Sequence, residues 1–120
     1  MRKPRETDTV RAILQFLALH HIPAWRMNSG AAKIGNRLVR FGSPGMSDIL
    51  GIHPSRPAHT YGGEIGRFLA IEVKSKFGRL RPAQAAFSQT VSQAGGLYLV
   101  VRHVDDVANA LGLCPISGAR

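Results

Sequence analysis

Residues 68–74 read Phe-Leu-Ala-Ile-Glu-Val-Lys, and this stretch decides the fold. The run at 68–73, apolar except for Glu72, predicts a strand that is buried on both faces. Residues i and i+2 of a strand point to the same face, so Glu72 and Lys74 should project together. Placing a carboxylate and an ammonium in a central strand is costly unless they are paired or bind something. The stretch therefore predicts a central strand that carries a charged pair.

The sequence after this strand predicts a strand–helix–strand unit. Pro82 suits the first turn of a helix at residues 82–94, and Gly95-Gly96 suits its end. Residues 97–101 predict a second buried strand, which a right-handed crossover would place parallel to the first. A short helix is predicted at residues 105–111. The apolar stripe of the longer helix is expected to comprise Ala83, Ala86, Phe87, Thr90, Val91 and Ala94.

The sequence before the central strand predicts one helix and three short strands. The helix is expected at residues 6–20, with the apolar spacing of Val10, Ile13, Leu14 and Leu17. The strands are expected at residues 24–28, 37–41 and 48–52, with turns at Gly30 and Gly35-Asn36 and a surface loop at residues 53–66. The order α-β-β-β-β-α-β-α predicts a single α/β domain over residues 1–120, with a mixed β-sheet flanked by helices.

The charge balance favours a polyanionic partner. The chain has 16 basic and 7 acidic residues and a net charge of +9, which is typical of nucleic-acid binding, although a solvated basic surface would look the same. Residues 9–47 and 73–104 contain no acidic residue, so the few carboxylates stand isolated in basic surroundings. The single cysteine, Cys114, excludes an intrachain disulfide and a cysteine zinc cluster. With no apolar run near the roughly 20 residues that span a bilayer, we expect a soluble cytoplasmic protein without a membrane partner.

Three features of the sequence converge on one site. Asp48 follows a glycine-rich turn and begins a short apolar strand, Glu72 and Lys74 lie in the central strand, and Gln84 lies early in the next helix. Asp48 on a neighbouring strand can meet Glu72 at one end of the sheet, where two carboxylates repel unless a divalent cation relieves the repulsion. Mg²⁺ accepts two carboxylates plus a backbone carbonyl, for which Val73 is the candidate. Such a site could hydrolyse a phosphodiester bond.

Each feature is weak alone. A Glu-x-Lys is more often a surface salt bridge, and an Asp after a glycine turn is often an Asx-turn. Glu6 lies on the apolar stripe of the first helix, so it either faces the site or interacts with the helix dipole. Trp25 is expected in the core rather than as a base-stacking platform. Seven residues are expected to contact nucleic acid: Arg26, Asn28, Arg37, Arg40, Lys76, Arg79 and Arg81.

The sequence resembles a nuclease family. The order Glu6, Gly45-x-x-Asp48, Glu72-x-Lys74 and Gln84 is similar to the PD-(D/E)xK nucleases, and more narrowly to the virus-type replication-repair nuclease (VRR-NUC) domain. Residues 25–30, 39–42, 45–51, 70–74 and 95–96 carry the resemblance, which covers about residues 6–107. Met46-Ser47 stands where the family has the proline of its name; that proline is not a ligand.

The resemblance implies a restriction-endonuclease-like core and DNA cleavage that depends on Mg²⁺ or Mn²⁺. It implies Asp48 and Glu72 as metal ligands, Lys74 as the catalytic lysine, and Glu6 and Gln84 as supporting residues of the site. It also implies a homodimer that resolves four-way (Holliday) junctions in DNA repair. The interface is expected in the segment 26–41 and the last helix, with Val107, Ala110 and Leu111, unless these elements pack in the core of a monomer. Two alternatives stay open: another nuclease, such as a nicking or restriction-type enzyme or one acting on flaps or RNA, and a non-catalytic DNA-binding module.

Overall fold

A computed structural model describes residues 5–27, 30–55 and 64–114, with the backbone only for residues 30–32 and 39–41. It is a mixed α/β fold, as predicted. The elements are α1 (Glu6–Leu19), β1 (Ala24–Arg26), β2 (Gly30–Ile34), β3 (Arg37–Phe41), β4 (Ile49–Ser55), β5 (Ile65–Val73), α2 (Pro82–Gln93), β6 (Leu97–Val101) and α3 (Val104–Leu111). None of the described helices is long and apolar enough to cross a membrane.

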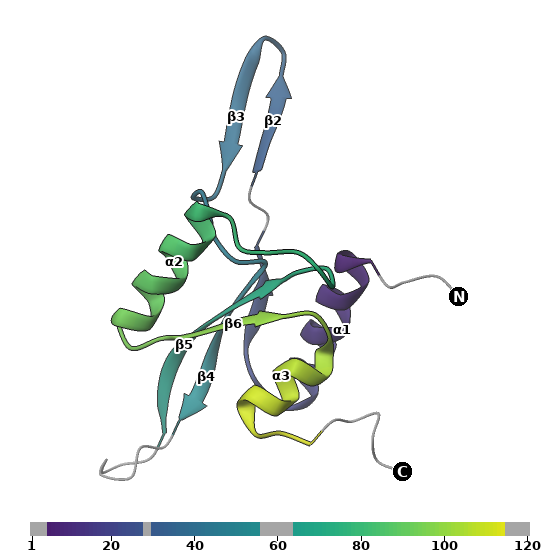
Figure 1. Ribbon diagram of the computed structural model, residues 1–120, viewed down its shortest axis with the longest axis vertical. Helices are drawn as coiled ribbons and strands as arrows, with labels where there is room; N and C mark the ends of the chain where they lie inside the picture. Colours follow the sequence, from purple (N-terminus) through teal and green to yellow (C-terminus); the bar gives the residue numbers. More distant parts are fainter. Residues whose placement is uncertain (1–4, 28–29, 56–63, 115–120) are drawn as a thin grey trace.

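The main sheet has four strands in the order β1-β4-β5-β6, with β5 in the interior (Figure 1). The β1–β4 and β4–β5 pairs are antiparallel, whereas β5 and β6 are parallel. The predicted parallel pairing and the mixed sheet are therefore confirmed. The prediction that the central strand is buried on both faces is correct for residues 69–73 but not for Phe68, which is 44% exposed. The prediction that residues 97–101 form a buried strand is correct only for Val101, because β6 lies at the edge of the sheet.

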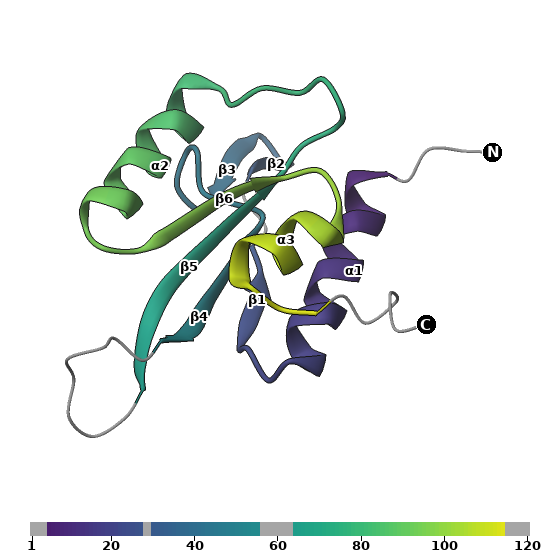
Figure 2. The ribbon, with the colours of Figure 1, turned by 60° about the horizontal axis from the view of Figure 1, so that its bottom comes forward.

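The two faces of the sheet are covered unequally. Figure 2 shows α1 and α3 on one face and α2 on the other. Under α1 and α3 lies the hydrophobic core, whose fully buried members include Ile13, Leu17, Ile49, Leu69, Ile71, Val73, Val101 and Val107. On the opposite face α2 buries only Val91, and most of its predicted apolar stripe is exposed. Alanines give the helix little apolar area to bury, so the face that carries Glu72 is thinly covered.

The segment before β4 differs from the prediction by one strand. Residues 30–34, which begin at the predicted Gly30 turn, form β2, and β2 pairs with β3 as a separate antiparallel hairpin. The predicted Gly35-Asn36 turn is correct: Gly35 has a φ of +62°, which favours glycine, and this tight turn brings even an alanine-rich segment into register with β3. The hairpin projects from the body in Figure 1, so β3 does not join the main sheet.

Two further predictions are wrong. Trp25, expected in the core, is 55% exposed, because its partner in register is Leu50 on the thinly covered face. The predicted loop at residues 53–66 is shorter than expected on its described sides. Residues 53–55 pair with residues 65–67 and so extend the β4–β5 ladder. Backbone hydrogen bonds can continue a ladder where the sequence has no apolar pattern that would predict a strand. Residues 56–63 lie outside the described part.

Candidate active site

Antiparallel pairing of β4 with β5 brings Asp48 and Glu72 to the same place. Ile49, the first residue of β4, is the register partner of Ile71 in β5. Asp48, just before β4, therefore lies opposite Glu72, the residue after Ile71. The Asp48 Oδ2 atom accepts a hydrogen bond of 2.8 Å from the Val73 N–H. The Asp48 carbonyl accepts one of 2.7 Å from the Met27 N–H. Asp48 is therefore fixed between the two strands that flank it.

Glu72 is buried, with an exposed fraction of 4%. Its Oε2 atom accepts a hydrogen bond of 3.0 Å from Gln84 Nε2 and lies 3.6 Å from Lys74 Nζ. The predicted common projection of Glu72 and Lys74 is thus confirmed. The second oxygen, Oε1, is also buried, and no group in the described part of the chain bonds to it. A buried carboxylate oxygen without a donor is costly, so the site has an unmet need for positive charge or a donor.

The electrostatics of Glu72 agree with this need. The pKa of its carboxyl is raised from 4.5 to about 7, mainly because burial disfavours the charged form and also because of the negative charge of Asp48, while Lys74 acts in the opposite direction. One ammonium is therefore too little to compensate for two neighbouring carboxylates in a desolvated position. A divalent cation beside both carboxylates would supply the missing charge.

Gln84 belongs to the first turn of α2 and is held at both ends of its amide. Oε1 accepts a hydrogen bond of 2.9 Å from the Arg81 N–H, and Nε2 donates to Glu72. Gly45, in the turn before Asp48, has a φ of +81° and lies so close to the Ala83 carbonyl that a Cβ would collide with it. The close contact between the turn at Gly45 and the first turn of α2 therefore places Gln84 next to Glu72.

The donor set suits a hard cation. In a strand, the N–H and C=O of one residue point to the same side, so the Val73 carbonyl faces the side on which its N–H meets Asp48. Asp48, Glu72 and this carbonyl offer oxygen ligands, which Mg²⁺ and Mn²⁺ accept together with water. The described residues contain no group of three or more His, Cys, Asp or Glu that could hold a metal ion. A zinc-type cage of His and Cys ligands is therefore a poor fit to these residues, whereas the two carboxylates and the carbonyl could hold Mg²⁺ or Mn²⁺ together with water.

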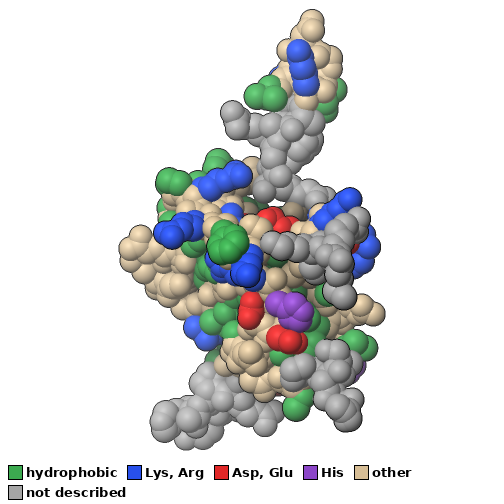
Figure 3. All heavy atoms as spheres, turned by 45° about the vertical axis from the view of Figure 1, so that its right-hand side comes forward, with side chains coloured by type: hydrophobic (Ala, Val, Ile, Leu, Met, Phe, Trp, Pro, Cys, Tyr) green, Lys and Arg blue, Asp and Glu red, His purple; other side chains and the backbone are tan. Residues whose placement is uncertain are grey.

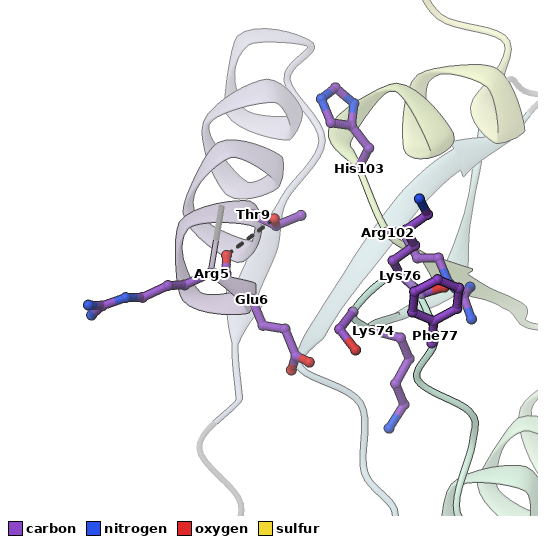
Figure 4. Close-up of a pocket in the computed structure, with 9 residues that line it drawn as sticks. Arg5, Glu6, Thr9, Lys74, Lys76, Phe77, Arg102 and His103 are labelled. Carbon is purple, nitrogen blue, oxygen red and sulfur yellow. Dashed lines mark hydrogen bonds between the residues drawn. The ribbon is translucent and has the colours of Figure 1, made fainter. Parts of the chain in front are cut away.

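Glu6 and Lys74 line one cavity of about 690 Å³ next to the carboxylates. Figure 4 shows the two side chains extending in the same direction from α1 and from the end of β5. Asp8, not Glu6, accepts the hydrogen bond of 3.3 Å from the Arg5 N–H at the helix start. Glu6 is exposed and faces this cavity, which favours the site-facing alternative for Glu6. The lining comprises Arg5, Glu6, Thr9, Lys74, Ser75, Lys76, Phe77, Arg102 and His103.

The basic residues predicted to bind nucleic acid lie at the surface where the structure describes them. Arg26, Arg37, Lys76, Arg79 and Arg81 are exposed, and Lys76 also lines the cavity. Figure 3 shows Lys and Arg side chains gathered below the hairpin, near a few acidic and histidine side chains. Asn28 and the side chain of Arg40 lie outside the described part.

Sequence reasoning missed Ser47 and Tyr98. Both hydroxyls are buried, and neither meets the geometry of a hydrogen bond to any described group. Burial raises the pKa of Tyr98, the nearby Ser47 hydroxyl lowers it, and the charges of Glu72 and Asp48 raise it, so the four groups are neighbours. Tyr98 pairs in register with Ala70, two residues before Glu72 on the same face. Its signal in the sequence is a lone hydroxyl in the strand Leu-Tyr-Leu-Val-Val.

No family model, curated protein or solved structure matches the chain. The candidate site comprises two adjacent carboxylates, an ammonium, an amide and a backbone carbonyl. The ammonium, Lys74, connects it to a cavity that Arg5, Lys76 and Arg102 also line.

Proposed function

We propose that the protein is a metal-dependent hydrolase of phosphodiester bonds. More narrowly, it is a DNA endonuclease of the PD-(D/E)xK type, similar to the VRR-NUC domain. The observation that carries the proposal is the buried Oε1 of Glu72, which no described group hydrogen-bonds, beside Asp48 and with Lys74 at 3.6 Å from the other oxygen. In a purely structural ion pair, both oxygens of the Glu72 carboxylate would accept hydrogen bonds. In a metal ligand, one oxygen lacks a donor because the metal binds to it.

Each residue of the site has a separate role. Asp48, Glu72 and the Val73 carbonyl would hold Mg²⁺ or Mn²⁺, which when bound lowers the pKa of water and neutralises charge on the phosphate. Lys74 donates to the phosphate or orients the attacking water, because its ammonium lies beside the carboxylates and lines the cavity. Gln84 keeps the Glu72 carboxylate in one orientation. Glu6 approaches the same space from α1.

The direct test is cleavage of plasmid DNA with Mg²⁺, with Mn²⁺ and with a chelator. We expect nicked or linear product with either metal and none with the chelator, and no product from Glu72→Gln. Cleavage that is unchanged by the chelator would overturn the metal dependence. A parallel RNA substrate separates a deoxyribonuclease from a ribonuclease.

A four-way DNA junction and a homodimer are the proposed substrate and assembly. Symmetric resolution of a junction needs two sites on opposite strands, which a two-fold dimer provides. Val107, expected at the interface, is instead fully buried in the protein's own core, so α3 contributes less than predicted. The hairpin retains that role, because Ile34 and Leu38 are 60% and 63% exposed.

Light scattering and cleavage of a junction beside linear duplex test this assembly. We expect a dimer at micromolar concentration that cleaves the junction faster, and we expect Leu38→Asp to lower both the dimer fraction and this preference. A monomer that cuts both substrates equally would leave a generic nuclease.

The second candidate is a non-catalytic DNA-binding module. The hydrogen bond from the Val73 N–H to Asp48 favours this binding module, because such a bond is a structural role for Asp48 that requires no metal and no catalysis. Metal-independent DNA binding without any cleavage would support this alternative.

A further inference from the structure

Phe77 lies in the loop that follows Lys74, and it is the most exposed of the large apolar side chains in the described residues, at 80%. A single exposed apolar residue is ordinary on a protein surface. Phe77 differs because it lines the cavity that also contains Lys74 and Glu6. Figure 4 shows its ring near the side chains of Lys74, Lys76 and Arg102. Its exposure therefore occurs at the proposed site of chemistry.

The loop is held rigidly on both sides of the phenyl ring. Arg102 donates a hydrogen bond of 3.2 Å from Nε to the Lys76 carbonyl and one of 2.6 Å from Nη2 to the Gly78 carbonyl. The Gly78 N–H closes the turn on the Ser75 carbonyl at 3.0 Å. An arginine that clamps the residues before and after Phe77 fixes the backbone from which the ring projects. The backbone that carries the ring is thus held in one position, which lowers the part of the entropy cost of binding that comes from ordering the loop.

The surroundings of the ring are cationic. Lys76 Nζ lies 5.4 Å from the ring centroid, within cation–π distance. Arg5, Lys74 and Arg102 also line the cavity, and Glu6 is its only carboxylate among the described residues. An aromatic face surrounded by cations complements a nucleotide, in which a flat base is joined to an anionic phosphate. The cavity of about 690 Å³ falls in the range of about 300–1,000 Å³ that ordinary ligand pockets have.

We infer that Phe77 is a stacking platform for one DNA base that has left its duplex neighbours, next to the phosphate that Lys74 contacts. A base inside a duplex has both faces covered by its neighbours, so only an unpaired or extruded base can use the ring. The inference rests on the proposed function and deepens it. The substrate class is DNA with unpaired nucleotides at the cut, such as a branch point, a flap or a single strand. Arg102 is a positioning residue for the loop.

The test compares Phe77→Ala, Phe77→Leu and Phe77→Trp with wild-type protein and with Leu19→Ala. Leu19 is an exposed apolar residue on α1 that does not line the cavity, so its variant controls for loss of apolar surface. Binding is measured with a chelator present, so that no cleavage occurs. The probes are a single-stranded oligonucleotide containing 2-aminopurine, whose fluorescence falls on stacking, and a fully paired duplex of the same sequence.

We expect wild-type protein, Phe77→Trp and Leu19→Ala to quench the fluorescence. Phe77→Ala and Phe77→Leu should lose the quenching and bind single strands about 5- to 100-fold more weakly, since stacking on an aromatic ring contributes about 1–3 kcal/mol per base. Duplex affinity should change less than twofold. Equal weakening for both probes, or none for the single strand, would overturn the inference. Phe77→Leu keeps an apolar side chain, so its result separates ring stacking from apolar contact.

The design distinguishes the two levels of the proposal. If wild-type protein stacks the base but cleaves nothing with Mg²⁺, the stacking platform stands and the nuclease fails. If cleavage occurs and the Phe77 variants bind and cut paired and unpaired substrates with unchanged preference, the nuclease stands and the platform fails.

Discussion

Gln84 and Glu72 are joined by a hydrogen bond of 3.0 Å from Nε2 to Oε2, and the other end of the same amide accepts the Arg81 N–H at 2.9 Å. A residue that caps the first turn of α2 therefore also orients the carboxylate of Glu72 in β5. Helix capping and site geometry depend on one side chain, and the amide cannot rotate without losing both bonds.

Gln84→Ala should lower cleavage strongly and lower the free energy of unfolding by about 1–3 kcal/mol. The exposed Arg81 N–H can turn to water, but the substitution also removes the donor to the buried Oε2 of Glu72. It also frees Glu72 to reorient, for which we expect at least a tenfold loss in rate. The measurement is the cleavage rate beside thermal melting. Gln89→Ala, an exposed substitution on the same helix, is the control and should change neither.

Gly45→Ala should destabilise the fold by about 2–4 kcal/mol. The positive φ of Gly45 strains any other residue, and a Cβ would collide with the Ala83 carbonyl at the start of α2. Gly35→Ala is the matched control, because Gly35 also has a positive φ, but a Cβ added there would meet no atom within 4 Å. Gly35→Ala should lower the free energy of unfolding by about 1 kcal/mol. The free energy of unfolding is measured by urea denaturation. An equal decrease in the two variants would show that the close contact of Gly45 with α2 does not contribute to the effect of Gly45→Ala.

The stability of the metal-free protein should fall as pH rises from about 4.5 to about 7. The folded pKa of Glu72 lies above its ordinary value of 4.5, because burial and Asp48 disfavour the charged form. The folded protein thus binds this proton more tightly than the unfolded chain, and the stabilisation is lost as pH rises through about 7. The loss amounts to about 3 kcal/mol at most, since one pKa unit corresponds to about 1.4 kcal/mol.

Denaturation with a chelator across this pH range is the measurement. Glu72→Gln should flatten this part of the profile, and Mg²⁺ should restore stability above pH 7 for wild-type protein only. An identical slope in Glu72→Gln would assign the pH dependence to another group.

Phosphate contacts predict a steep dependence of DNA affinity on salt. Each cation that neutralises a phosphate releases counterions and contributes about one unit to the log–log slope. Arg37, Arg79 and Arg81 are exposed, and Arg40 is a fourth arginine among the residues predicted to contact nucleic acid. We expect each single alanine variant to reduce the slope by about one unit, measured by fluorescence anisotropy from low to moderate salt. If the log–log slope were unchanged in all four variants, these arginines would not be part of the DNA-binding surface.

Most of the main sheet could be predicted because its signals are local. Residues 68–73, apolar except for Glu72, and residues 97–101 have the apolar runs that are typical of strands, and residues 69–73 are buried on both faces. The strand β2 was missed because Gly30 and two alanines have no strand pattern; pairing with β3 stabilises it. The interface role of Val107 was wrong because periodicity identifies an apolar face without showing what covers it.

The candidate site was predictable in its charged residues and not in its neutral ones. Asp48, Glu72 and Lys74 stand out because ionisable groups next to apolar strands are rare. Ser47 and Tyr98 approach the carboxylates only through strand register, and Phe77 is marked only by its exposure and the clamp from Arg102. These relationships join residues that are distant in sequence, so no local pattern contains them.

The central claim is that Asp48, Glu72 and Lys74 carry out metal-dependent chemistry on DNA. The measurement is Mg²⁺-dependent cleavage beside DNA affinity for Asp48→Asn, Glu72→Gln and Lys74→Ala, with Asp105→Asn as an exposed carboxylate control on α3. We expect each site variant to lose about 100-fold or more in rate, in line with removal of a transition-state contact, while binding DNA within about threefold of wild type. Asp105→Asn should cleave normally. Full Mg²⁺-dependent activity in any one of the three site variants would contradict the assignment.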